Sequence, residues 1–518
     1  MGRYIEGKSR HQLELFPARL DEWIEEEHPA RVIDKFVENI NINSLGLKEN
    51  NDNAGRPRYS PFALIKALIY CYSIGIRSSR KIERLVGENM AVHWLTRGLK
   101  PDYRTIARFR SDNAEALKGL LAETIKLYID LDLYNEDLKD TIFIDGTKIY
   151  SDSNGDRIID PKRLSKKVKQ ILKEAEIIDE KEDKIYGENN SGGKLTPEKM
   201  EKLEGLLKEA KKKVEKRLEK KENSDKELKS KIEKTEENIS AYKDLFEEKR
   251  DKKDRVNLTD PDARLMKHRL HGSHASYNAQ LSVDGNRFIM GADVVNREND
   301  FHQLQNMVKK SISNLGKDRK IRKCVADKGY YDTNEIKEVM KMNIEPVVKK
   351  QHQGKRNNKY FGREDFTHDK EKDVVVCPFQ KELTFNGIVI DKGKEYRRYR
   401  CSEPVCKSCP LNHKCIRGEK RKSAKVYTIL NDKEYLKKYE AIMNNEKNKE
   451  IYGKRSEIVE PVFGTVKRDL NFTRFSLRGL EKVNGEFVGL ISPVYNIRKL
   501  INLVGIKELM KKMDYSTA

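Results

Sequence analysis

The sequence predicts a mixed α/β fold in which acidic residues follow buried strands and gather at one edge of a sheet. Two short apolar runs end in aspartate, at Asp145 and at Asp327, and each is typical of a buried strand whose last residue points out of the sheet. A hairpin signal at 284–286 and a helical pattern at 300–312 lie between them, and a third acid, Glu460, lies in a later helical pattern. This order fits a mixed sheet, because functional residues in such sheets collect at strand ends.

The charge balance indicates what kind of partner the chain has. Its 518 residues include 106 Lys+Arg and 84 Asp+Glu, which gives a formal net charge of +22. Such an excess of basic residues indicates a polyanionic partner. Only 37% of the residues are hydrophobic and 37% are charged, so part of the chain must be long solvated helix.

No stretch of the sequence has the pattern of a targeting or membrane segment. The first residues lack the apolar run of a signal peptide, and no run approaches the roughly 20 apolar residues that span a bilayer. We therefore expect a cytoplasmic protein whose cysteines are reduced unless they bind metal.

Residues 1–135 predict an N-terminal helical domain. Apolar residues recur at helical spacing within 55–112, where Gly75 ends one helix and the next begins near Ser78. Short helices with basic faces suggest a helix-turn-helix-like DNA reader, although an arginine-rich face that only keeps a helical bundle soluble is the simpler alternative. The candidate DNA-binding residues are Arg77, Arg80, Lys81, Arg84, Arg104 and Arg108.

Residues 160–255 predict a solvated helical insertion. Apolar residues step by three and four through 203–218, a polar break follows at 223–225, and a similar seam resumes through 228–246. This pattern predicts an antiparallel helical hairpin. The sequence leaves open whether the hairpin contacts DNA, mediates dimerisation or is a passive spacer.

Residues 346–430 predict a second insertion, rich in lysine, short strands and cysteine. Four of its cysteines have the spacing Cys-x4-Cys-x2-Cys-x5-Cys, which is typical of a structural Zn²⁺ site. An iron–sulfur cluster is the second choice and unligated thiols are the alternative. The candidate ligands are Cys401, Cys406, Cys409 and Cys415, whereas Cys71 and Cys324 lie in apolar runs and are expected in the core.

The third acid lies in a helical pattern over 457–470. Glu460, Gly464 and Lys467 fall at i, i+4 and i+7, so a carboxylate, bare backbone and an ammonium share one face, which suits a phosphate. Pro461 predicts that the helix begins or kinks at Glu460. The competing interpretation is an ordinary amphipathic helix whose apolar residues pack inward.

The combination of the three acids matters more than any one of them. An aspartate beside a glycine is more often part of a turn than a metal ligand. Cutting or joining a phosphodiester, however, uses two divalent cations about 3.5 to 4 Å apart, and hard cations such as Mg²⁺ take oxygen ligands. Carboxylates from three separate elements are suited to hold them.

Several motifs also occur together in one order. They are 60–64, 75–81 and 108–110, then Phe143-Ile144-Asp145-Gly146-Thr147-Lys148, Thr259-Asp260-Pro261-Asp262-Ala263, Tyr277-Asn278-Ala279-Gln280, Ala326-Asp327-Lys328-Gly329-Tyr330, Cys409-Pro410-Leu411 and Val459-Glu460-Pro461-Val462-Phe463-Gly464. In these motifs the chain resembles DDE transposases of bacterial insertion sequences, most closely the IS1182 group within the IS4/IS5-like set. The resemblance runs from about residue 10 to 505.

The resemblance implies an RNase H-like catalytic core in which Asp145, Asp327 and Glu460 are the metal-binding triad. The core is expected to comprise 136–159, 256–345 and 431–505, with a tail at 506–518.

A family signature of Tyr, Arg, Glu and Lys maps to Tyr452, Arg455, Glu460 and Lys467, which are expected to contact DNA or metal. Four residues separate Arg455 from Glu460 where the family has three, so the role of Arg455 is in question. The nearby Glu457 fits neither the motif nor the distance to Lys467.

The resemblance further implies the chemistry and the partners. Two Mg²⁺ ions, or Mn²⁺, are expected to activate water for cleavage at a transposon end and then the 3′-hydroxyl for attack on target DNA. The partners are double-stranded DNA and a second copy of the chain, as a homodimer or higher oligomer in the bacterial nucleoid. Two alternatives are a metal-dependent nuclease that does not join ends, and a non-catalytic DNA-binding regulator derived from a transposase.

Overall fold

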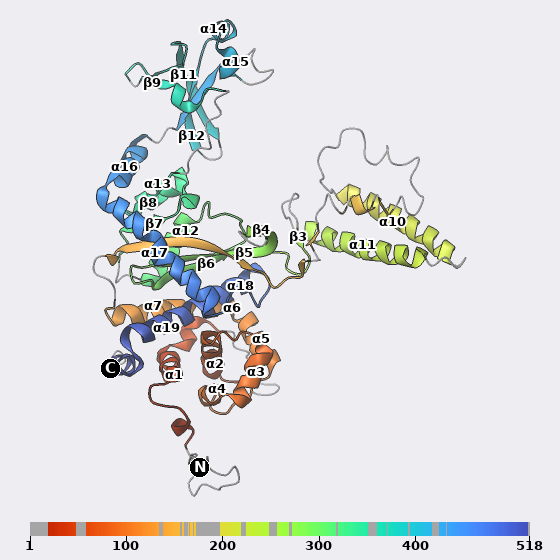
Figure 1. Cartoon of the computed structure of the whole chain (residues 1–518), viewed down its shortest axis with the longest axis vertical. Helices are drawn as coiled ribbons and strands as arrows, with labels where there is room; N and C mark the ends of the chain where they lie inside the picture. The colour runs from red at the N-terminus through yellow and green to blue at the C-terminus, as the bar shows by residue number, and fades with distance from the viewer. Residues whose placement is uncertain are drawn as a thin grey trace, which may run out of the picture.

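Two sheets, a group of helices and a long helical pair make up the molecule (Figure 1). The computed structural model describes residues 19–47, 58–133, 138–155, 158–159, 164, 166–168, 170–171, 197–218, 224–247, 256–268, 272–316, 320–350, 360–369, 371–391, 394–416, 424–430 and 433–515. Among the helices within these ranges, none is long and apolar enough to cross a membrane.

A six-stranded mixed sheet forms the centre of the molecule. Its order is β4-β5-β1-β7-β8, with β6 also paired to β5. β5 runs antiparallel to β1, β4 and β6, whereas β7 runs parallel to β1 and β8. The strands are β1 Thr141–Tyr150, β4 Arg264–His268, β5 Gly272–Val283, β6 Ile289–Val295, β7 Lys323–Ala326 and β8 Glu345–Val348. The predicted mixed α/β class is confirmed.

β1 is longer than the sequence predicts. The prediction ended this strand at Asp145, but β1 continues to Tyr150 and pairs with β5 from Phe143 onward. Gly146 lies inside the strand, and only glycine fits there, because a Cβ atom would be 2.3 Å from the side-chain nitrogen of Gln280 on β5 and 2.4 Å from Oδ1 of Asp300. Asp145 therefore lies within β1, whereas Asp327 directly follows β7 as predicted.

The hairpin predicted at 284–286 joins β5 to β6. Oδ1 of Asp284 accepts hydrogen bonds from the backbone N–H groups of Asn286 (2.9 Å) and Phe288 (3.0 Å). Its Oδ2 accepts a third from the hydroxyl of Tyr128, at 2.7 Å. These bonds fix the turn and tie it to a helix of the N-terminal group.

Two helices cover opposite faces of this sheet. Ser282 on β5 pairs with Ile144 and contacts α12 (Leu304–Leu315). Asp145, the next residue of β1, points the other way and contacts α17 (Glu446–Arg468). Figure 1 shows α17 crossing one face of the sheet. Two further helices, α13 Thr333–Lys341 and α16 Lys433–Asn444, pack near β8.

α17 does not begin at Glu460, so of the two alternatives predicted from Pro461, a helix start or a kink, the start is wrong. The helix starts at Glu446, and Pro461 lies inside it. A proline removes the hydrogen bond to the carbonyl four residues earlier, here that of Glu457. Glu457 is exposed, so water can satisfy that carbonyl. The apolar residues of α17 pack inward as the competing interpretation expected.

Helices from both ends of the chain share one hydrophobic core with the sheet. α1 packs on α20, and α2 packs on α19. The N-terminal helices are α1 Pro29–Asn39, α2 Pro61–Ser73, α3 Ser79–Glu88, α4 Met90–Leu95, α5 Tyr103–Asp112, α6 Ala114–Leu117 and α7 Gly119–Asp130. The C-terminal ones are α18 Leu480–Glu486, a π-helical turn Phe487–Ile491, α19 Ser492–Val504 and α20 Ile506–Tyr515. The expected tail is thus largely a packed helix.

A buried polar network connects the two ends. The hydroxyl of Tyr72 donates to Oε1 of Glu486 (2.9 Å) and accepts from Arg110 (2.7 Å). The other carboxylate oxygen of Glu486 accepts from the backbone N–H of Ser476, at 2.9 Å. Arg110 is 4% exposed and Glu486 1%. A buried charge requires such partners, so this network fixes how the N-terminal helices dock.

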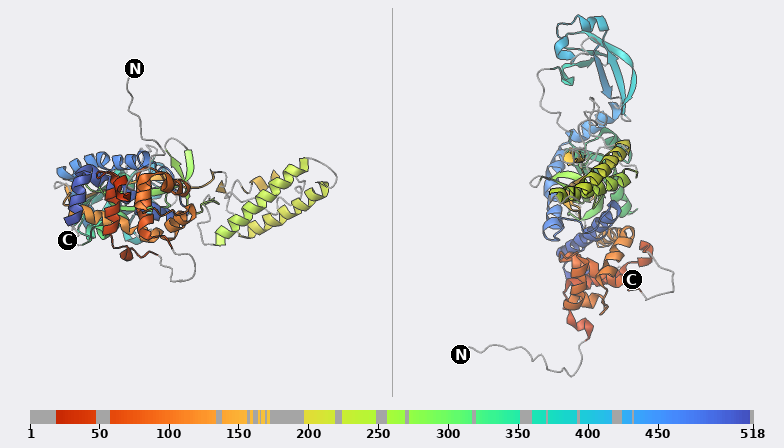
Figure 2. Two further views of the ribbon diagram at one scale, coloured as in Figure 1. Left: turned by 90° about the horizontal axis from the view of Figure 1, so that it is seen from below. Right: turned by 90° about the vertical axis from the view of Figure 1, so that its right-hand side faces the viewer.

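α10 (Pro197–Leu218) and α11 (Ser224–Glu247) form a long antiparallel pair. Lys211 pairs with Glu236 at 3.2 Å, and Lys229 pairs with Glu215 at 3.0 Å, so the two helices run in opposite directions. The pair projects from the side of the molecule (Figures 1 and 2). At its base β2 (Ile158–Ile159) pairs with β3 (Val256–Asn257).

A second sheet carries the cysteine-rich segment. Its order is β13-β12-β11-β10-β9, and it has its own small hydrophobic core. Figures 1 and 2 show it at the end of the molecule opposite to α1–α5. The elements are β9 Thr367–Asp369, β10 Val374–Val376, β11 Glu382–Asp391, β12 Lys394–Arg400, β13 Val426–Leu430, α14 Glu403–Lys407 and α15 Asn412–Cys415.

Candidate active site and cysteine cluster

Asp145 on β1 and Asp327, which directly follows the parallel neighbouring strand β7, lie at the same level of the sheet. Ile144 of β1 pairs with Ala326 of β7, so the next residue on each strand is an aspartate at the same level of the sheet. The carboxyl group of Asp145 points to the face that α17 covers, and the charge of Asp327 raises its pKa, so the two carboxyl groups are close. The structure therefore brings together two acids that are 182 residues apart in the sequence (327 − 145).

The carboxyl group of Asp145 is buried among opposing charges. Its Oδ2 accepts a hydrogen bond from Nη1 of Arg455 at 3.1 Å, and its Oδ1 accepts one from the backbone N–H of Gly146 at 2.9 Å. Burial raises the pKa of Asp145 to about 6; Arg455 opposes this rise, and the nearby Asp300 and Asp327 add to it. A carboxyl group in this position gains from a cation placed beside it.

Asp300, which the sequence analysis missed, is a further acid at this place. Its Oδ1 accepts hydrogen bonds from the side-chain amides of Asn278 (2.8 Å) and Gln280 (2.7 Å). Gln280 in turn accepts a hydrogen bond from the hydroxyl of Tyr330. Asn278 and Gln280 belong to the motif Tyr277-Asn278-Ala279-Gln280 noted in the sequence. This motif was the one sequence signal for the part of the site that contains Asp300.

Glu460, the third predicted acid, lies on the helix that contacts Asp145. It lies on α17 five residues after Arg455, and its side chain is exposed. Within the described ranges, no three His, Cys, Asp or Glu side chains are arranged so that they would hold one metal ion. The donor chemistry is still that of a hard cation, because the acids are oxygen donors and Arg455 already places a positive charge against Asp145.

The other three signature residues lie along the face of α17 that meets the sheet. Nζ of Lys467 donates to Oγ1 of Thr147 on β1 at 2.6 Å, and burial lowers the pKa of Lys467. Nζ of Lys349 lies 4.3 Å from the centre of the Tyr452 ring. Burial raises the pKa of Tyr452, and the charge of Asp327 adds to this. Arg455 is the residue of this set that touches a predicted catalytic acid.

Five of the six candidate DNA-binding residues are exposed on two packed helices. Tyr103 on α5 lies between them, with the guanidinium carbon of Arg80 5.2 Å and that of Arg104 5.7 Å from its ring centre. The five are Arg80, Lys81 and Arg84 on α3 and Arg104 and Arg108 on α5.

Arg77 has a different place. Its guanidinium donates to the backbone carbonyl of Asn471, at 2.8 Å, and to that of Arg474, and it lies 4.9 Å from the centre of the Phe472 ring. These contacts join the start of α3 to the segment after α17. No sequence pattern predicts these contacts, because the partners are backbone atoms almost 400 residues away.

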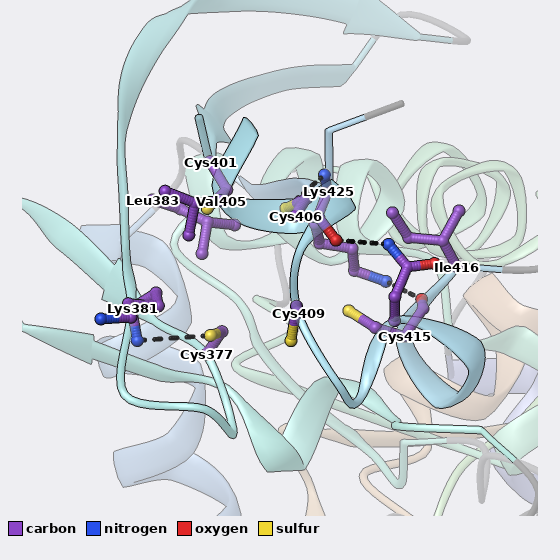
Figure 3. Close-up of a pocket in the computed structure, with 11 residues that line it drawn as sticks. Cys377, Lys381, Leu383, Cys401, Val405, Cys406, Cys409, Cys415, Ile416 and Lys425 are labelled. Atoms are coloured by element: carbon purple, nitrogen blue, oxygen red, sulfur yellow. Dashed lines mark hydrogen bonds between the residues drawn. The ribbon is translucent and has the colours of Figure 1, made fainter. Parts of the chain in front are cut away.

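The four predicted cysteine ligands surround one hollow, and Cys377 joins them (Figure 3). Cys377 follows β10, Cys401 follows β12, Cys406 lies on α14, Cys409 follows that helix and Cys415 ends α15. The cavity they line has a volume of about 30 Å³. Cys377, which is distant in sequence from the other four, was not among the predicted ligands but lines the same cavity.

The thiols influence one another. Burial raises the pKa of Cys401 to about 12, and its neighbours Cys406 and Cys377 add to the effect. Burial also raises the pKa of Cys415, while the ammonium of Lys425 opposes the rise. Cys71 and Cys324, by contrast, are fully buried in the main core, as predicted.

Comparison with known proteins identifies two domains. Residues 376–501 match the family described as Transposase DDE domain, and residues 18–112 match the one described as Transposase domain (DUF772). No curated protein and no solved structure matches the chain. The first match contains Glu460 and the cysteine cluster, and the second contains α1 to α5. A DDE domain implies an RNase H-like core, with which the mixed sheet agrees, and both matches are consistent with the IS1182 type. The chain therefore carries a DDE transposase domain over 376–501 and a second transposase domain over 18–112.

Proposed function

We propose that this transposase cuts DNA at the ends of an insertion sequence and joins the cut ends to target DNA by metal-dependent phosphoryl transfer. The observation that carries the proposal is the placement of Asp145 on β1 and Asp327 at the end of the adjacent parallel strand β7, where α17 crosses the sheet. A site with two neighbouring, partly buried acids and nearby cationic side chains is what transfer of a charged phosphoryl group requires.

Asp145, Asp327 and Glu460 would hold two Mg²⁺ or Mn²⁺ ions. Bound there, such ions lower the pKa of water and of a 3′-hydroxyl and neutralise charge on the phosphate. Glu460 has to turn toward the two aspartates for this. Its exposed side chain on a helix that already contacts β1 leaves it free to do so.

The basic residues near the acids would position the DNA. Lys467 lies beside β1 at Thr147, two residues after Asp145, where its ammonium can bind a phosphate oxygen. Arg455 holds Asp145 in place, and its charge can pass to the phosphate when metal neutralises the carboxylate. Tyr452 lies one turn before Arg455 on the same helix.

The exposed basic face of α3 and α5 would bind the insertion-sequence ends. Arg80, Lys81, Arg84, Arg104 and Arg108 are the contacts we propose, whereas Arg77 serves the docking of α3. A homodimer or higher oligomer on two DNA ends, in the bacterial nucleoid, completes the proposal. The net charge of +22 supports a DNA partner.

The test is cleavage and joining of labelled end DNA in Mg²⁺ by the wild type and by Asp145→Ala, Asp327→Ala and Glu460→Gln. We expect each variant to bind DNA and none to cut it. Glu457→Gln is the matched control, since Glu457 is also exposed on α17 three residues earlier, and it should cut normally.

Each other outcome has a defined meaning. Cutting without joining by the wild type would identify a nuclease, and binding without cutting would identify a regulator. Retained cutting by Glu460→Gln alone would remove Glu460 from the site and leave the two aspartates in it.

We also propose that the cysteine cluster holds a structural Zn²⁺, with an iron–sulfur cluster as the second choice. Zn²⁺ takes four thiolates, and five cysteines surround the cavity. Metal analysis and the visible absorption spectrum of the purified protein separate zinc from iron–sulfur. Cys409→Ser should lose the metal, whereas Ser402→Ala, beside Cys401 in the same segment, should keep it. A metal-free wild type purified without chelator would overturn the proposal.

A further inference from the structure

A pocket lies between the second half of α17, the helix α19 and the hairpin that joins β5 to β6. Its volume is about 170 Å³, whereas a single water molecule needs roughly 10–15 Å³, so there is room for a larger ligand. α17 contributes Pro461, which directly follows Glu460, and Thr465 one turn later. Neither aspartate of the candidate active site belongs to the lining, so this pocket is a separate feature of the same helix.

Three cationic side chains line this pocket. They are Arg287 of the hairpin and Arg498 and Lys499 of α19. Burial lowers the pKa of Lys499, and the charge of Arg287 adds to this fall, while that of Asp284 opposes it. Arg287 and Lys499 are therefore close enough to repel one another.

The acids near the pocket have other partners. Asp469, which also lines the pocket, pairs with Arg468 at 3.0 Å. Asp284 is buried, and its carboxylate oxygens accept hydrogen bonds from the turn backbone and from a neighbouring tyrosine. Arg498 donates to the backbone carbonyl of Ser73, at 3.3 Å. Within the part of the chain that the structure describes, no carboxylate forms an ion pair with any of the three cations, so the pocket has an excess of positive charge.

The backbone of Arg287 adds an independent observation. Its φ is 64°, in the left-handed region that favours glycine, and its N–H closes the turn by donating to the carbonyl of Asp284 at 3.0 Å. The hydroxyl of Tyr495, another lining residue, donates to the carbonyl of Arg287 at 2.9 Å and holds this conformation. Glycine would adopt this turn without strain. An arginine held there indicates a function for its side chain.

We propose that this pocket binds a phosphate group, with Arg287, Arg498 and Lys499 as its donors. A guanidinium offers a planar fork of N–H groups to phosphate oxygens, and an ammonium adds a point charge. A bound phosphate also ends the repulsion among the cations. The phosphate comes from the DNA backbone or from a free phosphate compound, since the chemistry of the pocket is the same for both. The inference does not rest on the metal site, because none of these residues belongs to it.

The first measurement is the salt dependence of binding to a labelled DNA duplex, by fluorescence anisotropy without divalent metal. If the pocket holds a phosphate of the DNA backbone, Lys499→Gln and Arg287→Gly should each reduce the slope of log K against log[salt] by about 1. Lys507→Gln is the matched control, since Lys507 is exposed on the neighbouring helix α20, and it should leave the slope unchanged.

The second measurement is titration calorimetry of the full chain with inorganic phosphate, in the absence of DNA. If the ligand is a free phosphate compound, the wild type and Lys507→Gln should bind phosphate at one site. Lys499→Gln and Arg287→Gly should each bind it about tenfold more weakly, because each loses a charged hydrogen-bond donor.

Thermal unfolding separates this role from a structural one. Lys499→Gln removes one of two repelling charges, so it should unfold at the temperature of the wild type or higher. Arg287→Gly should keep the turn, because glycine adopts a positive φ readily. If both variants bind more weakly only because they unfold at a lower temperature, the cations are structural and the inference is overturned.

The two binding assays identify the source of the phosphate. A reduced salt slope without calorimetric binding identifies DNA, and calorimetric binding with an unchanged slope identifies a free phosphate compound. Changes in both assays mean that the pocket accepts phosphate from either source. Equal slopes and equal phosphate binding in the wild type and both variants would overturn the inference. Neither assay depends on metal or on cleavage, so this failure is distinct from that of the proposed function.

Discussion

Arg455 donates a hydrogen bond to Asp145 across the interface between α17 and β1, at 3.1 Å. It is the contact by which a C-terminal helix meets the first predicted catalytic acid. The spacing of Arg455 from Glu460 departs from the family signature, yet the structure gives this arginine a defined partner. Its guanidinium neutralises Asp145 in the absence of metal.

Removal of Arg455 should change how Asp145 responds to pH. Arg455 opposes the rise in the pKa of Asp145, so in Arg455→Ala that pKa should move above about 6. Metal must then compete with a proton over a wider pH range. We expect the midpoint of Mn²⁺ binding to shift to higher pH, while Arg455→Lys, which keeps the charge, shifts it less. An unchanged midpoint in Arg455→Ala would show that the ion pair does not act on the site.

Asp145→Asn should stabilise the metal-free protein above pH 6. The pKa of Asp145 is raised from 3.8 to about 6, so the folded state binds this proton more tightly than the unfolded state. Stability is therefore lost as the pH rises from about 4 to 6, and the cost persists above that range. At 1.36 kcal/mol per unit the gain for asparagine is about 3 kcal/mol or less.

Unfolding by urea at pH 8 and at pH 3.5, in chelator, measures this difference. We expect Asp145→Asn to exceed the wild type at pH 8 and to equal it at pH 3.5. Excess Mg²⁺ should reduce the difference at pH 8. The opposite order at pH 8 would mean that Asp145 is stabilising when ionised.

Loss of single arginines on α3 and α5 should weaken DNA binding in a salt-dependent way. Arg80→Ala, Arg84→Ala, Arg104→Ala and Arg108→Ala should each reduce the slope of log K against log[salt] by about 1 if the residue contacts a phosphate. Lys126→Ala, an exposed lysine on α7, is the control and should leave the slope unchanged. If the slope of log K against log[salt] were the same in all five variants, the DNA would bind to a part of the protein other than α3 and α5.

Glu486→Gln should destabilise the fold. Its carboxylate accepts the Tyr72 hydroxyl and lies in the same buried network as Arg110. The two charges are linked through the Tyr72 hydroxyl and not by a direct ion pair, so removal of one costs up to about 3 to 5 kcal/mol, the scale of a broken buried ion pair, because the other charge is left without compensation. Glu481→Gln, exposed on the same helix α18, should cost little. Thermal or urea unfolding measures the stability of both variants. If Glu486→Gln were as stable as Glu481→Gln, the carboxylate of Glu486 would not compensate the charge of Arg110.

The parts of this fold that the sequence predicts are those with a local pattern. The apolar runs before Asp145 and Asp327 identify two strands, and the 284–286 signal identifies a hairpin. The end of β1 was misplaced, because its continuation depends on pairing with β5, which lies more than 100 residues away. Asp300 belongs to no periodic hydrophobic pattern of a strand or helix. Its position depends on amides 22 and 20 residues earlier that reach it only in the folded sheet.

The two ends of the chain complete each other, and this sets an order of events in synthesis. The N-terminal helices bury their apolar faces against α19 and α20, and Arg77 and Tyr72 find their partners beyond residue 470. A ribosome that has released only the first 130 residues has therefore made N-terminal helices that still lack their C-terminal packing and hydrogen-bond partners. We expect fragments that stop before the last helices to be recognised as unfolded, so the molecule becomes competent for DNA only after translation ends.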